Sequence, residues 1–177
     1  MRKFILAAAA ATVFAAPAYA QDTAGTTGGG HIEVIGGFDY VQGGVEESDS
    51  DGILYGVAAG YDFGGGNMVF GIELEATDST AKECDFGECL RAGRDLYAGG
   101  RIGTRMGEDA LVYVKAGYTN ARVKADDDGV NLDGVRAGLG VQYDIGTNLL
   151  AKLEYRYSNY EAGVERHQVV AGVGFRF

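Results

Sequence analysis

The sequence predicts an all-β fold, an eight-stranded antiparallel up-and-down transmembrane β-barrel with short turns at one end and longer loops at the other. Three observations predict this class. Apolar and polar residues alternate at period two along eight segments of about ten residues, which is typical of strands. Apart from Arg94 and Asp133, which begin their segments, no Asp, Glu, Lys or Arg falls on the apolar side of these segments. Aromatic residues gather toward both ends of that apolar side, as they do at membrane interfaces.

Residues 1–20 have the features of a secretory signal peptide. Arg2 and Lys3 form a charged start, an apolar run follows to Ala16, and Ala18 and Ala20 provide a small-x-small cleavage site. A transmembrane helix is the alternative, but the apolar run is shorter than the roughly 20 residues that a span needs. We therefore expect cleavage after Ala20 and export of the remaining chain.

Residues 21–30 are small, polar and rich in glycine, which predicts a flexible lead-in. The barrel domain is expected over residues 31–177. Its apolar side takes the even-numbered residues of the first, third, fourth and fifth segments and the odd-numbered residues of the others. The eight predicted strands are 31–41, 53–63, 68–77, 94–106, 110–121, 133–145, 149–160 and 167–177.

The opposite side of the strands carries acids and bases in nearly equal numbers, although the whole chain has a formal net charge of −10. A soluble barrel would place charges in water and would not need to balance them. A narrow membrane barrel fills its interior with side chains, so interior charges have to pair. We expect an interior charge network of Glu33, Asp62, Glu73, Glu75, Asp95, Arg101, Lys115, Arg136, Lys152, Glu154, Arg156 and Arg176, with Asp39, Arg105 and Asp144 on the same side.

Many glycines fall on the charged side of the predicted strands. We expect them to leave room for the long ionic side chains, although glycines also mark strand curvature and bulges. They are Gly37, Gly56, Gly60, Gly71, Gly99, Gly103, Gly117, Gly138, Gly140, Gly172 and Gly174.

The links between strands alternate in length. The 64–67, 107–109 and 146–148 links are short and rich in Gly and Asn, which suits hairpin turns. The 42–52, 78–93, 122–132 and 161–166 links are longer and polar. Barrels in bacterial outer membranes have short periplasmic turns and longer outer loops, so both chain ends are expected on the periplasmic side.

Four stretches resemble the small outer-membrane β-barrel family of Gram-negative bacteria, which includes OmpA-like transmembrane domains, opacity-type surface antigens and the "porin family" proteins of alphaproteobacteria. They are LVYVKAGYTNARV (111–123), GVRAGLGVQYDI (134–145), LEYRYSNY (153–160) and the GVGFRF ending. The resemblance implies location in the outer membrane and contact with its lipid and lipopolysaccharide.

The last strand also resembles the C-terminal signal by which such barrels are recognised for assembly, carried here by Val173, Phe175 and Phe177. This implies the barrel assembly machinery and periplasmic chaperones as partners. The expected role is structural or surface-exposed, in envelope integrity or as a surface antigen, with contacts to host cells or phage. A narrow channel for ions or small solutes, and an adhesin acting through its loops, are the alternatives.

Cys84 and Cys89 lie in the second long link, five positions apart. Because an exported chain meets an oxidising compartment, we expect a disulfide that closes a small loop. Two free thiols are the alternative, and a metal site is disfavoured because no histidine lies nearby.

Other functions find little support in the sequence. An acidic chain is a poor nucleic-acid binder. The acidic loops lack the spacing of an EF-hand, so no metal and no cofactor is expected. His31 and His167 are the only histidines and are expected at opposite rims. His167 could approach the hydroxyl of Ser158, but Gln168 and Val169 after it do not match the His-x-Ser arrangement of lipid A deacylases, so no enzyme is expected. The outer-rim bases could contact lipopolysaccharide phosphates: Arg91, Arg94, Arg122, Lys124 and Arg166.

Overall fold

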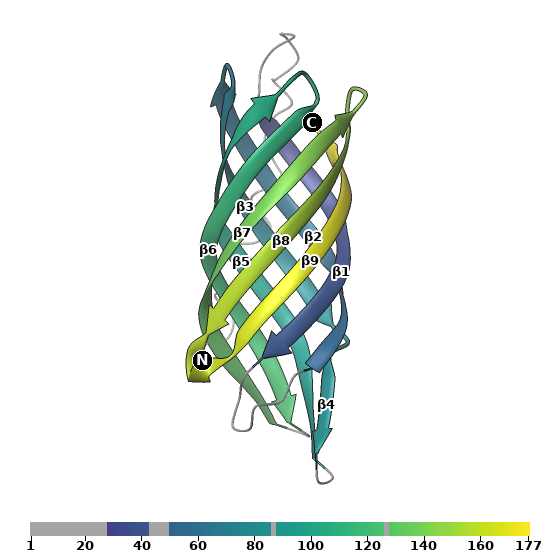
Figure 1. Ribbon diagram of the computed structural model, residues 1–177, viewed down its shortest axis with the longest axis vertical. Coiled ribbons are helices and arrows are strands. Elements are labelled where there is room, and N and C mark those ends of the chain that lie inside the picture. The colour runs from purple at the N-terminus through teal and green to yellow at the C-terminus, as the bar shows by residue number, and fades with distance from the viewer. Residues whose placement is uncertain (1–27, 43–49, 86–87, 126–127) are drawn as a thin grey trace, which may run out of the picture.

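The computed structural model describes residues 28–42, 50–85, 88–125 and 128–177 (Figure 1). These residues form long strands, and the only helix among them is the short 3-10 helix η1 (Glu161–Gly163), so the described part contains no helix able to cross a membrane. The strands are β1 (Gly29–Gln42), β2 (Ser50–Gly65), β3 (Met68–Ser79), β4 (Lys82–Asp85), β5 (Glu88–Met106), β6 (Ala110–Ala125), β7 (Asp128–Ile145), β8 (Leu149–Tyr160) and β9 (Glu165–Arg176).

The strands close into an antiparallel barrel. Strands that follow each other in the chain pair, except β3 and β4, and β1 pairs with β9. Val34 therefore lies opposite both Val57 and Val173. The short β4 continues the course of β3 beyond Thr80 and Ala81, and both pair with β5. β3 and β4 therefore occupy one position in the wall, and the barrel has eight strand positions. The predicted fold class is confirmed.

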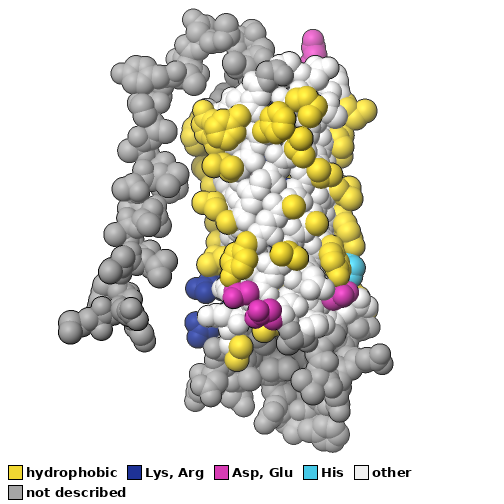
Figure 2. Space-filling view, turned by 90° about the vertical axis from the view of Figure 1, so that its left-hand side faces the viewer, with side chains coloured by type: hydrophobic (Ala, Val, Ile, Leu, Met, Phe, Trp, Pro, Cys, Tyr) yellow, Lys and Arg dark blue, Asp and Glu magenta, His cyan; other side chains and the backbone are white. Residues whose placement is uncertain are grey.

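The wall has its apolar side outward and its charged side inward. Along β3 exposed and buried residues alternate without a break, as the period of a strand requires. Val34 is 65 % exposed and Phe38 is 74 % exposed, whereas Glu73 is only 1 % exposed. Figure 2 shows hydrophobic side chains over the barrel wall, with charged groups near its ends. This inversion suits a protein whose outer solvent is lipid.

The two ends of the barrel differ. Short turns join β2 to β3, β5 to β6 and β7 to β8 at the end that we call the turn end, which is at the top of Figure 1. Each turn contains a glycine with positive φ: Gly66 at 68°, Gly107 at 78° and Gly146 at 71°. Glycine adopts this left-handed conformation without steric cost, so these positions allow tight hairpins. We call the opposite end the loop end.

Both ends of the barrel sequence lie at the turn end. The backbone N–H of Gly30 donates to the Phe177 carbonyl, and that of Phe177 donates to the Gly30 carbonyl, each at 2.9 Å. These bonds join the start of β1 to the residue after β9 and leave neither strand with a free edge there.

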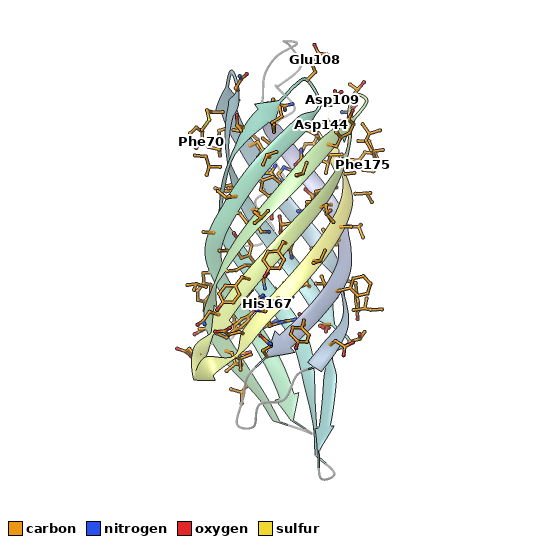
Figure 3. All side chains as sticks on the ribbon, in the orientation of Figure 1. Phe70, Glu108, Asp109, Asp144, His167 and Phe175 are labelled. Atoms are coloured by element: carbon orange, nitrogen blue, oxygen red, sulfur yellow. The ribbon has the colours of Figure 1, made fainter. Side chains whose placement is uncertain are left out.

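Exposed aromatic side chains form two belts on the wall. In Figure 3, Phe70 and Phe175 point away from the barrel near the turn end, and His167 lies toward the loop end. The turn-end belt comprises Tyr61, Phe63, Phe70, Tyr143, Phe175 and Phe177, and the loop-end belt comprises Phe38, Tyr40, Tyr55, Tyr118 and Tyr155. Amphipathic rings favour the level of lipid headgroups, so the belts mark the two interfaces.

Several strands extend farther at the loop end than the sequence pattern predicts. β5 begins at Glu88 instead of 94, and β7 begins at Asp128 instead of 133. Arg94 and Asp133 lie on the outward, exposed side near these ends, so the uncharged wall stops before them. Backbone pairing can continue beyond the apolar band because the ladder does not depend on side-chain polarity.

Candidate functional site

The lumen of the barrel holds a continuous set of ion pairs, which we call the lumen network. It contains eight carboxylates and eight guanidinium or ammonium groups from the described residues, so its formal charge is balanced. The acids are Asp39, Glu33, Asp62, Glu73, Glu75, Asp95, Asp144 and Glu154, and the bases are Arg101, Arg105, Lys115, Arg136, Lys152, Arg156, Arg166 and Arg176.

The turn end of the network reaches partly into solvent. Asp144 lies 3.4 Å from Arg105 and 3.3 Å from Arg176, and all three side chains are partly exposed. Arg176 also lies 3.5 Å from the buried Asp62. The guanidinium group of Arg101 donates to both carboxylate oxygens of Asp62, from Nε to Oδ1 at 2.9 Å and from a terminal nitrogen to Oδ2 at 2.6 Å. Such a bidentate pair fixes both side chains.

The centre of the network is organised around Lys115. Its Nζ lies 2.7 Å from Glu73, 2.6 Å from Glu75 and 2.7 Å from Glu154. All four side chains are shielded from solvent. Three carboxylates around one ammonium group leave an excess of negative charge, which has to be balanced by the arginines that lie next to them.

Arg156 provides part of that balance. It donates to Glu75 at 2.6 Å and also pairs with Glu154. The hydroxyl of Tyr113 donates to the second oxygen of Glu154 at 2.5 Å. A buried carboxylate needs partners for both oxygens, and Glu154 obtains them from two elements of the wall.

Arg136 and Arg166 close the network toward the loop end. Arg136 donates to Asp95 at 2.5 Å, to Ser158 at 2.8 Å and to the Tyr160 hydroxyl at 3.1 Å. Arg166 lies 3.2 Å from Asp95 and also pairs with Asp39. We call Asp39, Asp95, Arg136 and Arg166 the outer layer. It links β1, β5, β7 and β9 across the lumen.

Glycines on the inner face make room for these side chains. A Cβ atom at Gly140 would lie 2.6 Å from the ring of Tyr113, and one at Gly174 would lie 2.6 Å from Cγ of Glu33. Real Cβ atoms do not come this close to other atoms. The large lumen groups occupy the space that side chains at these glycines would fill.

The structure places each of the charged residues predicted for the interior inside the barrel, with Arg176 half-buried at the turn end. Val173, Phe175 and Phe177 lie outward at the end of the chain, and their role in assembly stays a prediction. Cys84 and Cys89 are backbone partners across the β4–β5 hairpin, but their side chains lie outside the described part of the structure. The side chains of Arg91 and Lys124 also lie outside the described part of the structure.

Two residues lie elsewhere than the sequence predicts. Arg166 was expected at the outer rim but is buried in the lumen, because β9 begins at Glu165 and gives it an inward side chain. His31 was expected at a rim but is 1 % exposed, inside the barrel among three carboxylates. The parity of the first predicted strand already placed position 31 on the inner side, which was the signal for this location.

The structure also separates Ser158 and His167, the one pair of nucleophile and base that the sequence suggested. Ser158 is buried in the lumen and accepts a hydrogen bond from Arg136. His167 lies on the outer face, where its Nδ1 is 2.7 Å from the hydroxyl of Tyr155 and its ring contacts Tyr157. The two residues thus lie on opposite sides of the wall, and His167 is not positioned to activate Ser158.

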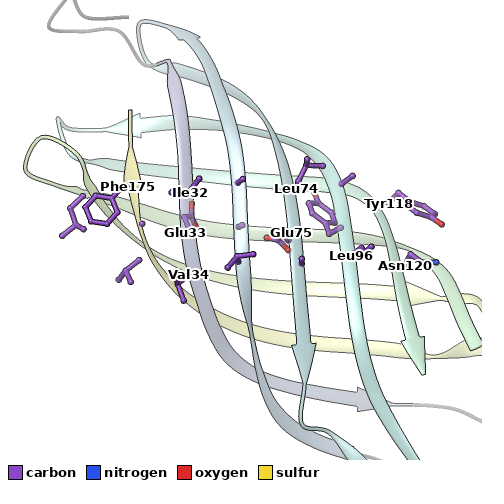
Figure 4. A pocket seen from close by; sticks show the side chains of 18 residues that line it. Ile32, Glu33, Val34, Leu74, Glu75, Leu96, Tyr118, Asn120 and Phe175 are labelled. Carbon is purple, nitrogen blue, oxygen red and sulfur yellow. The ribbon is translucent and has the colours of Figure 1, made fainter. Parts of the chain in front are cut away.

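An apolar groove on the outer wall is a second concave surface (Figure 4). It follows one row of paired residues from Phe175 through Ile32, Ala59, Leu74 and Ala98 to Tyr118. The small side chains of Ala59 and Ala98 lie between larger ones and form the hollow. Most of its lining belongs to the lipid-facing wall and suits acyl chains, although Glu33 and Glu75 of the lumen network also border it.

A closed barrel that is apolar outside and charged inside is an integral membrane β-barrel. More particularly, the chain belongs to the family described as outer membrane protein beta-barrel domain, whose family model matches residues 6–177. The protein is therefore an outer-membrane β-barrel protein, and its location is the outer membrane.

Curated relatives agree with this assignment. The chain is 29 % identical to the 25 kDa outer-membrane immunogenic protein of Brucella ovis over 129 residues, which cover 69 % of this chain and 62 % of that protein. It is 28 % identical to the 22 kDa outer membrane protein of Rhizobium leguminosarum bv. viciae, covering 72 % of this chain and 70 % of the relative. The chain thus spans less than two thirds of the length of the Brucella relative.

Solved structures share the fold at low sequence identity. Neisserial surface protein A superimposes with a TM-score of 0.65 at 14 % identity, covering 84 % of this chain and 97 % of that one. Ail, the attachment invasion locus protein of Yersinia pestis, superimposes with a TM-score of 0.64 at 15 % identity, covering 85 % and 99 %. At this level of identity the similarity shows the architecture of the barrel only.

Proposed function

We propose that this protein is a structural and surface component of the outer membrane, with a closed lumen and no catalytic activity. The observation that carries the proposal is the lumen network, which runs from Asp144 at the turn end to Asp39 at the loop end. Its charges neutralise each other within the barrel. The side chains of the network therefore fill the lumen, and no additional ion is needed to balance their charge.

The packing of the network supports a closed state. Every ion pair from Glu73 to Asp95 joins side chains that are fully buried or nearly so. An ion that passed through would have to separate several of these pairs. A buried charge that loses its partner costs about 3–5 kcal/mol, so the disruption of several buried pairs opposes a steady current.

Electrical recording in planar bilayers tests the proposal. We expect no steady conductance from the wild-type protein, because the outer layer blocks the lumen. A matched variant replaces Asp39, Asp95, Arg136 and Arg166 by alanine, which removes two acids and two bases and keeps the lumen neutral. We expect this variant to conduct, provided that heat-modifiable migration on SDS gels shows a folded barrel.

Steady ohmic current from wild-type protein would instead support the narrow porin-like channel, and would refute the structural role of the network as a plug. If the variant does not fold, the wild-type recording still decides between the two functions. Absence of current in both proteins would show that the central layer around Lys115 is sufficient to close the lumen.

A second candidate function is attachment to surface phosphates, and it rests on Arg94 and Arg122. Both are exposed on the outer face of neighbouring strands, flanking the Asp95–Ala121 pair just beyond the loop-end belt. This is the height of the outer lipid headgroups. Guanidinium groups bind phosphate oxygens with two parallel hydrogen bonds, so lipopolysaccharide is the partner that fits this pair.

Graded charge changes test this second candidate. We expect purified lipopolysaccharide to bind wild-type protein most strongly, the Arg94→Gln/Arg122→Gln variant less, and the Arg94→Glu/Arg122→Glu variant least. The order should weaken in high salt because these groups are exposed. Equal binding by all three proteins would remove the arginine pair from consideration and leave the structural role untouched.

A further inference from the structure

We propose that His31, Glu33 and Glu73 form a binding site for a first-row divalent transition metal ion inside the turn-end half of the barrel. Zinc is the probe of choice, because it accepts imidazole and carboxylate ligands in tetrahedral geometry. We call these three residues the lumen metal site. The inference concerns the interior alone and holds whether the barrel is structural or conducting.

The strands bring the three side chains together through a glycine. His31 and Glu33 are two residues apart on β1, so both point into the lumen. His31 pairs with Gly60 on β2, and Gly60 pairs with Glu73 on β3. A Cβ atom at Gly60 would lie only 2.6 Å from Nε2 of His31. The missing side chain thus lets the imidazole reach across β2 toward Glu73.

The ligand atoms have the spacing of an open metal site. Nε2 of His31 lies 3.6 Å from Oε1 of Glu33 and 3.9 Å from Oε2 of Glu73, and the three ligand atoms all lie within 4.8 Å of one another. Bonds of about 2.0–2.1 Å in a tetrahedral site place ligands roughly 3.3 Å apart. The two distances from His31 would have to shorten by a few tenths of an ångström, and the carboxylates would have to approach each other by up to about 1.5 Å, to produce that geometry.

These atoms are buried and have no hydrogen-bond partner among the described residues. This holds for both nitrogens of His31, for Oε1 of Glu33 and for Oε2 of Glu73. Buried polar atoms without partners are rare in native proteins and call for a ligand. One metal ion would satisfy Nε2 and both carboxylate oxygens at once, which direct hydrogen bonds at 3.6–3.9 Å do not.

The second nitrogen of His31 faces another carboxylate. Nδ1 lies 3.8 Å from Oδ2 of Asp62, which Arg101 holds in place. Metal-bound histidines commonly donate their other N–H to a carboxylate, which fixes the tautomer and the ring orientation. Asp62 occupies the position of that supporting group.

Two cations of the barrel compete with a bound metal. Lys152 Nζ lies 2.6 Å from Oε2 of Glu33 and 3.7 Å from Oε2 of Glu73, and Arg101 lies 3.5 Å from the latter. Because the lumen network is already neutral, a divalent ion adds positive charge next to the Lys152 ammonium group unless that group withdraws. We therefore expect removal of the Lys152 ammonium group to strengthen metal binding.

The experiment uses untagged mature protein, refolded in detergent, with Cys84→Ser/Cys89→Ser in every sample so that no thiol binds metal. Zinc binding is measured by equilibrium dialysis and metal analysis. His31→Gln removes the imidazole ligand. His167→Gln is the matched control, because it removes the other histidine from the outer wall. Lys152→Met removes the competing charge, and heat-modifiable migration verifies folding of each variant.

We expect a single saturable zinc ion per barrel, a loss of affinity of at least about tenfold in His31→Gln, no change in His167→Gln, and tighter binding in Lys152→Met. Cobalt should show the visible absorption of a nitrogen–oxygen site in wild-type protein but not in His31→Gln. Binding that survives His31→Gln, or a folded Lys152→Met barrel that binds no zinc, would overturn the proposal.

Discussion

At the scale of single residues, paired charges fill much of the lumen. Two small apolar clusters lie beside them, one of Ile35, Leu54, Ala58 and Val170 and one of Val69, Leu111 and Tyr113. Arg136 and Arg156 are among its most deeply buried side chains, and each contacts more than one carboxylate. A buried ion pair contributes little net stability relative to apolar packing, but loss of one partner is costly. The network therefore specifies one arrangement of the lumen more than it strengthens the fold.

The inner glycines give a residue-scale prediction, because Gly99 and Gly100 are adjacent and face opposite sides of the wall. A Cβ atom at Gly99 would overlap the Tyr97 hydroxyl and lie 2.5 Å from the Ala116 carbonyl oxygen. A Cβ atom at Gly100 would meet only the Gly71 carbonyl oxygen, at 3.6 Å. We expect Gly99→Ala to lower the free energy of unfolding by about 1–3 kcal/mol through overpacking.

Gly100→Ala is the control for this prediction. It should change the free energy of unfolding by less than about 0.5 kcal/mol, since its methyl group points to lipid. Urea unfolding in phospholipid vesicles, followed by tyrosine fluorescence, measures both variants. Equal costs at the two positions would show that the inner glycines are not required to make room for the lumen side chains.

At the scale of the strands, the two-residue period predicted the faces well and the ends poorly. The faces follow because a strand inserted between lipid and a charged lumen must alternate, as β3 does throughout its length. The extensions of β5 and β7 lie beyond the apolar band, where side chains need not alternate. Their pairing depends on neighbouring strands, which a single sequence does not reveal.

The partners in the lumen were beyond prediction for a related reason. Arg166 and Asp39 pair across the β1–β9 seam, although 127 positions separate them in the chain. Such a contact requires the register of two strands, and a shift by one residue would turn each side chain outward. The residue types and near-neutrality were readable, whereas the identity of each pair needed the closed barrel.

The β4–β5 hairpin carries the disulfide prediction. Cys84 and Cys89 are direct backbone partners, and Cα atoms opposite each other in antiparallel strands lie about 4.5–5.5 Å apart, which a disulfide can bridge. We expect denatured protein to take up no maleimide without reductant and two labels after reduction. Labelling of both cysteines before reduction would contradict this. A Cys84→Ser/Cys89→Ser variant should keep a heat-modifiable barrel, since the hairpin projects beyond the rim (Figure 1).

The last strand gives a prediction about assembly. Phe177 is 71 % exposed and follows β9 at the turn end, where the assembly signal is expected. We expect Phe177→Ala to reduce the fraction of protein that reaches the outer membrane as a heat-modifiable barrel. Phe63→Ala, in the same aromatic belt but on β2, should have a smaller effect. Refolding into detergent should be similar for both variants, because the difference lies in recognition; an equal defect of the two in cells would contradict the prediction.

At the scale of the whole molecule, the inverted wall and the neutral lumen depend on each other. An apolar exterior places the barrel in lipid, where unpaired backbone groups are prohibitively costly, so the sheet must close. Closure of eight strands leaves a narrow interior, and charges there must balance because water cannot screen them. The neutral lumen network of the described residues therefore does not carry the surplus negative charge of the chain.

This arrangement predicts that a charge on the outer wall costs free energy according to its depth in the membrane. Leu139 lies midway along the outward face of β7, between Val135 and Tyr143, and Ile145 ends the same strand. In bilayers, Leu139→Arg should lower the free energy of unfolding by about 2–4 kcal/mol and Ile145→Arg by about 0–1 kcal/mol, because arginine near the interface reaches headgroups and water. In detergent micelles, which deform around a charge, the difference should shrink. Equal costs at the two positions in bilayers would mean that the apolar belt of β7 does not face the hydrocarbon core, and the inward assignment of Arg136 and Glu154 would lose its physical basis.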